Sequence, residues 1–176
     1  LGAVSAFGMS GTNAHMVVQS YTHKNTPTIE RSPYYLLPVS AKKPEALKEK
    51  IEDLCRVLER TENRNEGLAA ISYTLQDGRH HFACRSAIVV EDIDDALFVW
   101  QAFNEGEKRP NIFQGKVARE FSGQTAIKQY ANDLVLQSQS KKEDPKKYQE
   151  TLHALADLYC QGYDIFWEKL YGTVVP

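Results

Sequence analysis

The order of apolar patterns between residues 34 and 118 constrains the fold more than any other feature of this chain. Three short β-prone runs, "YYLLPVSA", "CRSAIVVE" and "NIFQGKVA", are separated by segments whose apolar residues recur at helical spacing. Helices are predicted over residues 44–60, around residues 68–75, and after Asp94 and Asp95. The order β-α-α-β-α-β therefore predicts a small α+β domain, with a three-stranded sheet and helices on one face.

The segments on either side of this domain have different patterns. Residues 1–21 predict two short strands joined by a glycine turn, and because two strands alone bury too little apolar surface, we expect them to belong to a larger sheet. Residues 22–33 are polar, contain two prolines and are predicted to be a linker. Residues 119–176 predict a helical segment with an aromatic tail, which we expect to pack onto something larger.

Charge balance and cysteine content narrow the class of protein. Lys and Arg number 21 against 23 for Asp and Glu, so no excess of positive charge favours a nucleic acid partner. No apolar run reaches the roughly 20 residues needed to span a bilayer, and the first residues lack a leader pattern, so we expect a cytoplasmic protein without membrane contact. The three cysteines, Cys55, Cys84 and Cys160, are predicted to be reduced thiols that are buried or half-buried.

The strand-turn-strand segment resembles part of a known family. Residues 4–19, "VSAFGMSGTNAHMVVQ", closely resemble the last strands of the ketosynthase domain of modular polyketide synthases, where a stretch S-x-F-G-x-S-G-T-N-A-H ends a thiolase-like fold. The sequence departs from that pattern mainly at Ala6 and Met16. The resemblance implies that residues 1–21 are the C-terminal strands of a ketosynthase.

Two longer segments extend this resemblance. The stretches "YYLLPVSAKKPEALKEKIEDL" and "LAAISYTLQDGRHHFACRSAIVVEDIDDAL" look like the flanking, or linker, subdomain that follows such ketosynthases. The chain has no G-x-S-x-G elbow of an acyltransferase, and "LHALADLYCQGYDIFWEKLYGTVVP" resembles the post-linker segment of synthases whose acyltransferase is a separate protein. The resemblance implies a trans-acyltransferase synthase, with residues 34–118 as a flanking or docking subdomain and residues 119–176 packing back on the ketosynthase side.

The glycine turn is the candidate remnant of an acyl site. Family ketosynthases use a Cys nucleophile and two His residues, and the motifs that hold those three are absent here, so no complete catalytic set is expected. The resemblance implies that the Met9 backbone N–H forms half of an oxyanion hole, with the Met9 side chain at the acyl pocket. Gly8 and Gly11 permit the tight geometry, and Thr12 and Asn13 brace the loop. The alternative is an ordinary glycine turn.

The histidines have simpler interpretations. His15 lies outside the family triad, and we expect a structural, hydrogen-bonded side chain at the start of a strand. In "HHFAC", the spacing of His80, His81 and Cys84 could suit a metal, but no fourth ligand is evident nearby and alternate residues of a strand face opposite ways. We therefore predict no metal site.

Two sets of residues are candidates for binding a partner. One is a basic run that could steer acidic carrier proteins or simply be a solvated loop, and it consists of Lys141, Lys142, Lys146 and Lys147. The other is the aromatic tail, whose members either form an exposed anchor or, as we favour, pin the tail across a ketosynthase. The tail residues are Tyr159, Tyr163, Phe166, Trp167 and Tyr171, with Tyr163 and Trp167 as the candidate contacts. Trp100, Phe103 and Phe113 are expected in the subdomain core.

These patterns favour a non-catalytic scaffold of a trans-acyltransferase polyketide synthase. Its expected partners are the ketosynthase core, a free-standing acyltransferase and an acyl carrier protein, and the phosphopantetheine cofactor that the resemblance implies would be on the carrier protein, with none bound by this chain. One alternative is the terminal piece of a ketosynthase that catalyses decarboxylative condensation when complete. Another is lateral self-association through a helical insert at residues 124–140.

Overall fold

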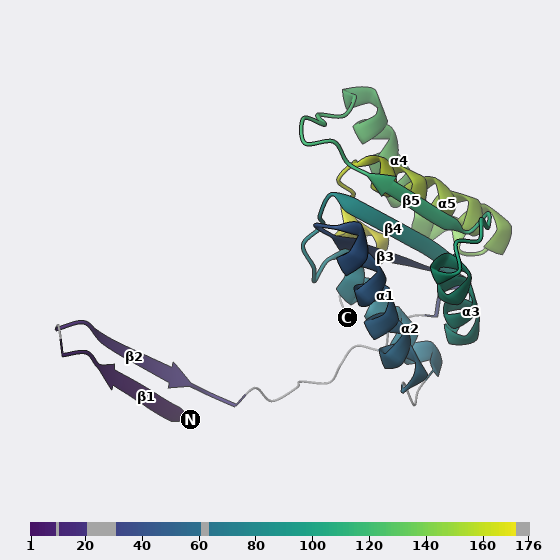
Figure 1. Ribbon diagram of the computed structural model, residues 1–176. Helices are drawn as coiled ribbons and strands as arrows, with labels where there is room; N and C mark the ends of the chain where they lie inside the picture. The colour runs from purple at the N-terminus through teal and green to yellow at the C-terminus, as the bar shows by residue number, and fades with distance from the viewer. Residues whose placement is uncertain (10, 21–30, 61–63, 172–176) are drawn as a thin grey trace.

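The computed structural model describes residues 1–9, 11–20, 31–60 and 64–171, so residues 22–30 of the predicted linker lie outside the described part. The predicted order β-α-α-β-α-β is confirmed (Figure 1). The strands are β1 (Gly2–Phe7), β2 (Asn13–Val18), β3 (Tyr35–Ala41), β4 (Cys84–Val90) and β5 (Ile112–Lys116). The helices are α1 (Pro44–Glu59), α2 (Arg64–Gln76), α3 (Ile93–Asn104), α4 (Thr125–Lys141), α5 (Pro145–Gln161) and the short 3-10 helix η1 (Trp167–Tyr171).

Local sequence signals explain where the helices begin. Pro44 opens α1, where its missing N–H costs no hydrogen bond. The Asp92 side chain caps α3 by accepting a hydrogen bond of 2.8 Å from the Asp95 N–H, and acidic residues occupy the first turn. Each helix then presents an apolar stripe, which in α1 includes the buried residues Leu47 and Ile51.

The three-stranded sheet has the antiparallel order β3-β4-β5, and every residue of β3 and β4 is buried. Alternate side chains of a strand point to opposite faces, so a sheet buried in this way must be covered twice. On one face, Leu37 and Ile88 share a core with α1 and α3, including Trp100. On the other face, Leu36 and Val89 share a core with α4 and α5 (Figure 1).

The α+β class and the three-stranded sheet are confirmed. We expected helices on one face of this sheet, and the structure has helices on both faces. Residues 34–118 do supply helices to one face, while α4 and α5, which we assigned to a separate segment after Ala118, cover the other. The contact with α5 is close, because a Cβ atom at Gly115 of β5 would collide with the Cys160 carbonyl oxygen. Residues on both sides of the predicted boundary after Ala118 therefore contribute to the second core.

Helix α2 lies along the free edge of β3. The Leu36 carbonyl points out of the sheet and accepts hydrogen bonds from the Ser72 hydroxyl (2.8 Å) and the Gln76 side-chain amide (2.7 Å). Two residues further along the edge, Pro38 has no N–H to offer a neighbouring strand. This edge is closed to pairing along the part that α2 covers.

We call the three-stranded sheet and its covering helices the body. The β1–β2 hairpin differs from this body in its exposure. Its strands pair with Gly2 opposite Val18 and Phe7 opposite Asn13, which confirms the predicted strand-turn-strand, and all of their residues are exposed. Figure 1 shows the hairpin apart from the helices and the other sheet. Within the described ranges, no helix is long and apolar enough to cross a membrane.

The core predictions are largely confirmed. Trp100 and Phe103 are buried and their rings meet edge to face, whereas Phe113 is half-buried. All three cysteines are free thiols, with Cys84 and Cys160 buried and Cys55 half-buried, as predicted.

Candidate functional site

The turn of the hairpin is tight, and its glycines are required there. The Gly8 N–H donates to the Thr12 carbonyl (2.8 Å), and the Gly11 N–H donates to the Gly8 carbonyl (3.1 Å). A Cβ atom at Gly8 would lie 2.7 Å from the Thr12 oxygen, and Gly11 has a φ of +85°. Met9 is fully exposed at the tip. The loop therefore has the compactness expected of an acyl-site lip, while the oxyanion role of the Met9 N–H stays a prediction.

His15 is a structural residue of the hairpin. It lies directly opposite Ser5 across the two strands, and its Nδ1 is 2.8 Å from the Ser5 hydroxyl. The predicted hydrogen-bonded histidine is therefore present. Asn13 is the first residue of β2 and follows Thr12 at the end of the turn. The five candidate loop residues are therefore consecutive in the sequence apart from position 10, and they are Gly8, Met9, Gly11, Thr12 and Asn13.

The "HHFAC" residues do not converge on a common point. His81 Nε2 donates to the Gln76 carbonyl (2.8 Å), which fixes the tautomer because a carbonyl only accepts, and the Tyr159 hydroxyl then donates to His81 Nδ1 (2.9 Å). His80 is exposed, and the Cys84 thiol donates to the Lys42 carbonyl, just after β3. The structure thus uses His81 to join α2 to α5.

Burial keeps this histidine–tyrosine pair neutral. Desolvation lowers the pKa of His81, assisted by the nearby Arg85 guanidinium, and desolvation raises the pKa of the Tyr159 hydroxyl to about 12. A neutral imidazole whose two nitrogens both have partners has no free position for a metal or a substrate. The pair therefore links α2 to α5 through hydrogen bonds that use both ring nitrogens.

A buried arginine, which the sequence reading missed, ties the tail to the sheet. The Arg85 side chain is 8% exposed and donates hydrogen bonds to the carbonyls of Phe82 (3.0 Å), Tyr159 (3.0 Å) and Tyr163 (3.3 Å). Its guanidinium also lies 4.8 Å from the Tyr159 ring centroid. The available signal was an arginine inside a β-prone apolar run, since a charged residue in such a place needs internal partners.

Tyr163 and Trp167 are buried within this chain, which agrees with the favoured packing role of the tail, and their role as partner contacts stays a prediction. They are 4% and 5% exposed, and the Trp167 ring meets the Tyr159 ring at 5.9 Å. The apolar second face of the sheet needs these rings as cover, which is why they point inward. Phe166 is exposed, and the Tyr171 side chain lies outside the described part of the chain.

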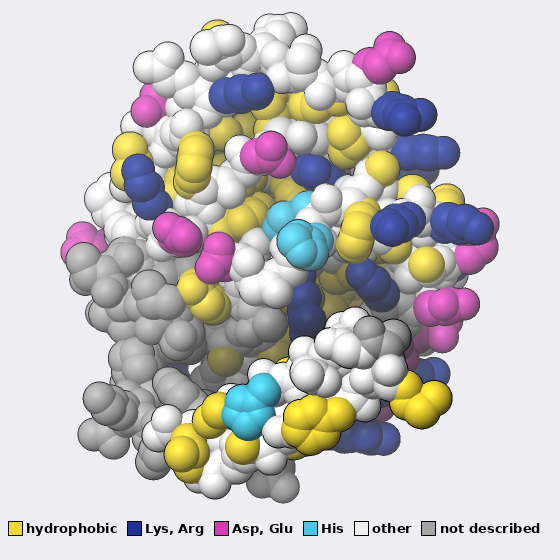
Figure 2. All heavy atoms as spheres, turned by 90° about the vertical axis from the view of Figure 1, so that its left-hand side faces the viewer, with side chains coloured by type: hydrophobic (Ala, Val, Ile, Leu, Met, Phe, Trp, Pro, Cys, Tyr) yellow, Lys and Arg dark blue, Asp and Glu magenta, His cyan; other side chains and the backbone are white. Residues whose placement is uncertain are grey.

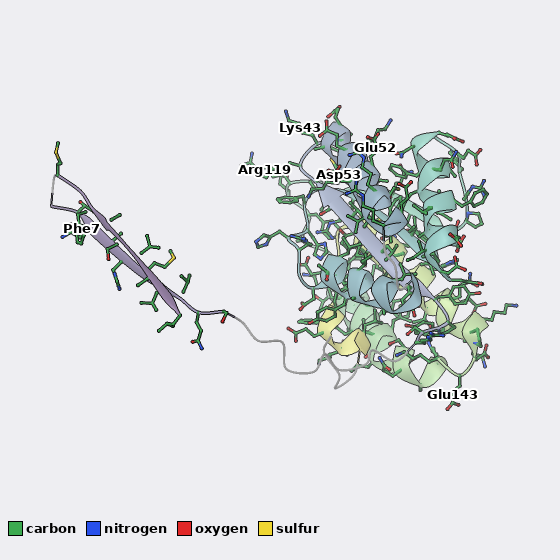
Figure 3. The ribbon with its side chains drawn as sticks, turned by 90° about the horizontal axis from the view of Figure 1, so that it is seen from below. Phe7, Lys43, Glu52, Asp53, Arg119 and Glu143 are labelled. Carbon is green, nitrogen blue, oxygen red and sulfur yellow. The ribbon has the colours of Figure 1, made fainter. Side chains whose placement is uncertain are left out.

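The predicted basic run surrounds the junction of α4 and α5. Lys146 and Lys147 are exposed, but the Lys147 ammonium pairs with the Asp144 carboxylate at 3.1 Å. Lys141 and Lys142 are half-buried, and Figure 3 shows Glu143 pointing outward beside them. Acidic side chains are therefore interspersed with the lysines, which weakens this surface as a binding site for an acidic protein.

A pocket opens at the uncovered end of the β3 edge, and we call it the β3-edge pocket. It has a volume of about 390 Å³ and lies between the end of β3, helices α1 and α2, and the loop of residues 79–82. Basic side chains of Lys50, Arg79 and His80 border it, over half-buried Leu54 and Leu75. Figure 2 shows histidine side chains beside a hollow that Lys and Arg side chains border.

Comparison with known proteins identifies the region. Residues 35–98 match the family described as CurL-like, PKS C-terminal. The chain is 28% identical over 177 residues to the polyketide synthase PksN of Bacillus subtilis, and 30% identical over 171 residues to the polyketide synthase ThaG of Burkholderia thailandensis. These alignments cover 99% and 92% of this chain but only 3% of each relative.

Solved structures give the same placement. The chain matches the ketosynthase from module 6 of the bacillaene synthase of Bacillus subtilis with a TM-score of 0.67 and 27% identity, over 99% of this chain and 30% of that one. A bacillaene ketosynthase of Bacillus amyloliquefaciens matches with a TM-score of 0.62 and 28% identity, over 99% of this chain and 26% of that one. The chain thus spans less than a third of the ketosynthases that it matches. It belongs to the polyketide synthase family, as the C-terminal end of a ketosynthase with its flanking subdomain.

Proposed function

We propose that this chain is a non-catalytic scaffold of a trans-acyltransferase polyketide synthase. In this proposal the hairpin completes a ketosynthase sheet, the α+β body stands beside it in the cytoplasm, and exposed surfaces of the body hold a free-standing acyltransferase or a carrier protein. The tight Gly8–Gly11 turn supports the first part, because such a lip needs the rest of an acyl site around it. The covered sheet supports the second, because a body with cores on both faces can act as a spacer.

The observation that carries the proposal is the state of the thiols. A ketosynthase nucleophile must react as a thiolate. Burial instead raises the pKa of the Cys160 thiol to about 12 and raises that of Cys55, while Cys84 is buried and directed at the Lys42 carbonyl. The Cys55 and Cys160 thiols are therefore protonated at neutral pH and are poor acyl acceptors, and burial keeps an acyl thioester away from Cys84.

Incubation of the purified chain with an acyl thioester tests this proposal against the alternative of a ketosynthase fragment that condenses when complete. Intact-mass spectrometry should show no acylated chain, whereas a complete ketosynthase in parallel should gain the acyl mass. Acylation of this chain at any cysteine would contradict the non-catalytic assignment. Decarboxylative condensation by a ketosynthase rebuilt around the chain would fit both interpretations, so the isolated chain is the informative sample.

The docking part of the proposal has a separate test. Titration with the cognate free-standing acyltransferase should give saturable binding, and charge reversal of the four predicted lysines tests their contribution. A matched control is Lys48→Glu, which reverses an exposed lysine on α1. Absence of binding at about 100 μM, a free energy near −5.5 kcal/mol, would leave the chain as a spacer only. The changed residues are Lys141, Lys142, Lys146 and Lys147.

Exposed apolar side chains on α4 favour lateral self-association as a second candidate function. Tyr130 is 53% exposed and Leu136 is 58% exposed, although the opposite side of the same helix is in the core. Removing the whole insert at residues 124–140 would open that core, so point changes are the better test. Tyr130→Asp with Leu136→Asp should lower the sedimenting mass if α4 holds two copies together, and an unchanged mass would exclude this role.

A further inference from the structure

The β3-edge pocket has a fixed wall. The Phe82 N–H donates to the Ser40 hydroxyl (2.9 Å), and that hydroxyl donates to the His80 carbonyl (3.4 Å). These bonds tie the loop of residues 79–82 to the end of β3. The pocket is therefore formed before any ligand arrives, which reduces the entropy cost of binding.

The side chains around the opening are basic. The Lys50 ammonium donates to the Ser40 carbonyl (2.9 Å) and lies 5.2 Å from the Phe82 ring centroid, so its position is defined. That hydrogen bond uses one of the three ammonium donors, and Arg79 and His80 are exposed on the loop. Among the residues that line the pocket, none is Asp or Glu. A carboxylate is the group that this border would attract.

Further positive charge lies at the same end of the sheet. The strands end together, because Ala41 of β3 pairs with Cys84 of β4, which pairs with Lys116 of β5. Lys43 follows β3 and Arg119 follows β5, and Figure 3 shows both side chains pointing outward at this end, together with Glu52 and Asp53 of α1. Charges of both signs are therefore mixed around this end, and the charge that would select an acidic ligand is that of the pocket border itself.

The edge beside the pocket does not accept another strand. Pro38 lacks an N–H, and the Ser40 carbonyl is occupied by Lys50. A ligand must then be recognised by side chains, because β3 has no main-chain groups available here for hydrogen bonds to it. The floor contributed by Leu54 and Leu75 is apolar and half-buried, so it would gain from covering by an apolar side chain.

We propose that the β3-edge pocket binds an extended acidic segment of a partner protein, which places one apolar side chain over Leu54 and Leu75 and carboxylates against Lys50 and Arg79. The size of the pocket, about 390 Å³, is in the range of small-ligand sites. This proposal goes beyond the scaffold function and stands without it, because it concerns only which chemistry the pocket selects.

Peptide pools presented to the immobilised full chain test the proposal without a known partner. One pool of seven-residue peptides carries Leu, Ile or Phe at the centre between Asp and Glu. A second replaces the acids with Lys, and a third replaces the central residue with Gly. The first pool should be retained at least about 10-fold more than either of the others at low salt, and less as salt rises, because the charges are exposed.

Variants of the chain locate the retention. Lys50→Glu with Arg79→Glu should abolish the preference for the first pool, while Lys48→Glu with Lys108→Glu, an equal charge change at exposed positions outside the pocket, should preserve it. Circular dichroism of each variant checks that the fold is intact. Equal retention of the three pools, or an undiminished preference in the Lys50 and Arg79 variant, would overturn the proposal. Neither result would alter the acylation test of the scaffold.

Discussion

The two sheets of this molecule are built from similar β-prone residues and lie in opposite environments. Every residue of strands β1 and β2 is exposed, including Val4 and Val17, whereas every residue of β3 and β4 is buried. The difference is what covers them, since β3 and β4 have helices on both faces. Strand-forming residues therefore define the conformation, but the free energy comes from burial against other elements.

The largest difference in unfolding free energy is expected between a truncated side chain in the core of the body and one in the hairpin. Trp100→Ala removes a side chain that is fully buried between the sheet and α1, and it should lower the free energy of unfolding by about 3–5 kcal/mol. Met16→Ala in the hairpin, where the side chain is 63% exposed, should change it by less than about 0.5 kcal/mol. Urea unfolding followed by circular dichroism measures both. Similar costs for the two changes would mean that the hairpin is packed in solution.

A pair of glycines offers a smaller contrast with the same added methyl group. Gly115→Ala would push a Cβ atom into the Cys160 carbonyl of α5 and should destabilise the body by about 1–3 kcal/mol. At Gly2 of the hairpin the new Cβ atom would meet only the Val18 side chain, at an ordinary 3.8 Å, so Gly2→Ala should be close to neutral. Thermal unfolding of both variants gives the comparison. A neutral Gly115→Ala would show that α5 can move away from β5 without cost.

Lowering the pH should weaken the body through His81. Burial lowers its pKa in the folded chain, so its contribution is present above the ordinary value near 6.5 and is lost as the pH falls below it, because the unfolded chain takes up the proton more readily. His81→Gln should reduce this loss of unfolding free energy at low pH. Part of the loss should remain, because burial also lowers the pKa of His153. Urea unfolding at pH 7.5 and 5.5 measures the change. Met16→Ala, which changes an exposed hairpin side chain and removes no titratable group, serves as the control and should keep the wild-type pH dependence.

The smallest effect on the body is expected from removing the hairpin. A chain without residues 1–20 should unfold within about 0.5 kcal/mol of the original, because the hairpin side chains are exposed. Hydrogen exchange in the intact chain supplies the companion measurement, and amides of Val17 and Val18 should exchange much faster than those of Ile88, Val89 and Val90. Matching rates would show that the hairpin is covered, and would remove the contrast between the two sheets.

Periodicity predicted most of the secondary structure, and the starts of α1 and α3 are marked by Pro44 and by the Asp92 cap. In the helical segment predicted over residues 119–176, Tyr148, Leu152 and Leu155 form a buried stripe of α5. It did not indicate which surface α5 would cover, since an apolar stripe fits any apolar partner. A glycine within a predicted strand could have suggested Gly115 as a place of close backbone approach. For the same reason, the pattern of the aromatic tail did not indicate that its rings would cover the second face of this sheet.

The candidate sites were less predictable than the fold. The hairpin loop was found because its residues are contiguous and follow a family pattern. The β3-edge pocket is assembled from β3, α1, α2 and a loop, so Lys50, Leu75 and Arg79 share no local pattern in the sequence. Pro38 within a strand was the one sequence signal that marked the edge on which the pocket opens.

The closed β3 edge lowers the risk of strand exchange where many folded segments lie close together. This chain corresponds to 3% of the length of PksN, so a comparable segment there would be surrounded by other folded segments at high local concentration. An open strand edge in such crowding invites strand exchange with a neighbour and, from there, aggregation. Because the Leu36 carbonyl accepts hydrogen bonds from Ser72 and Gln76, this part of the edge has no acceptor left for a strand of a neighbouring segment.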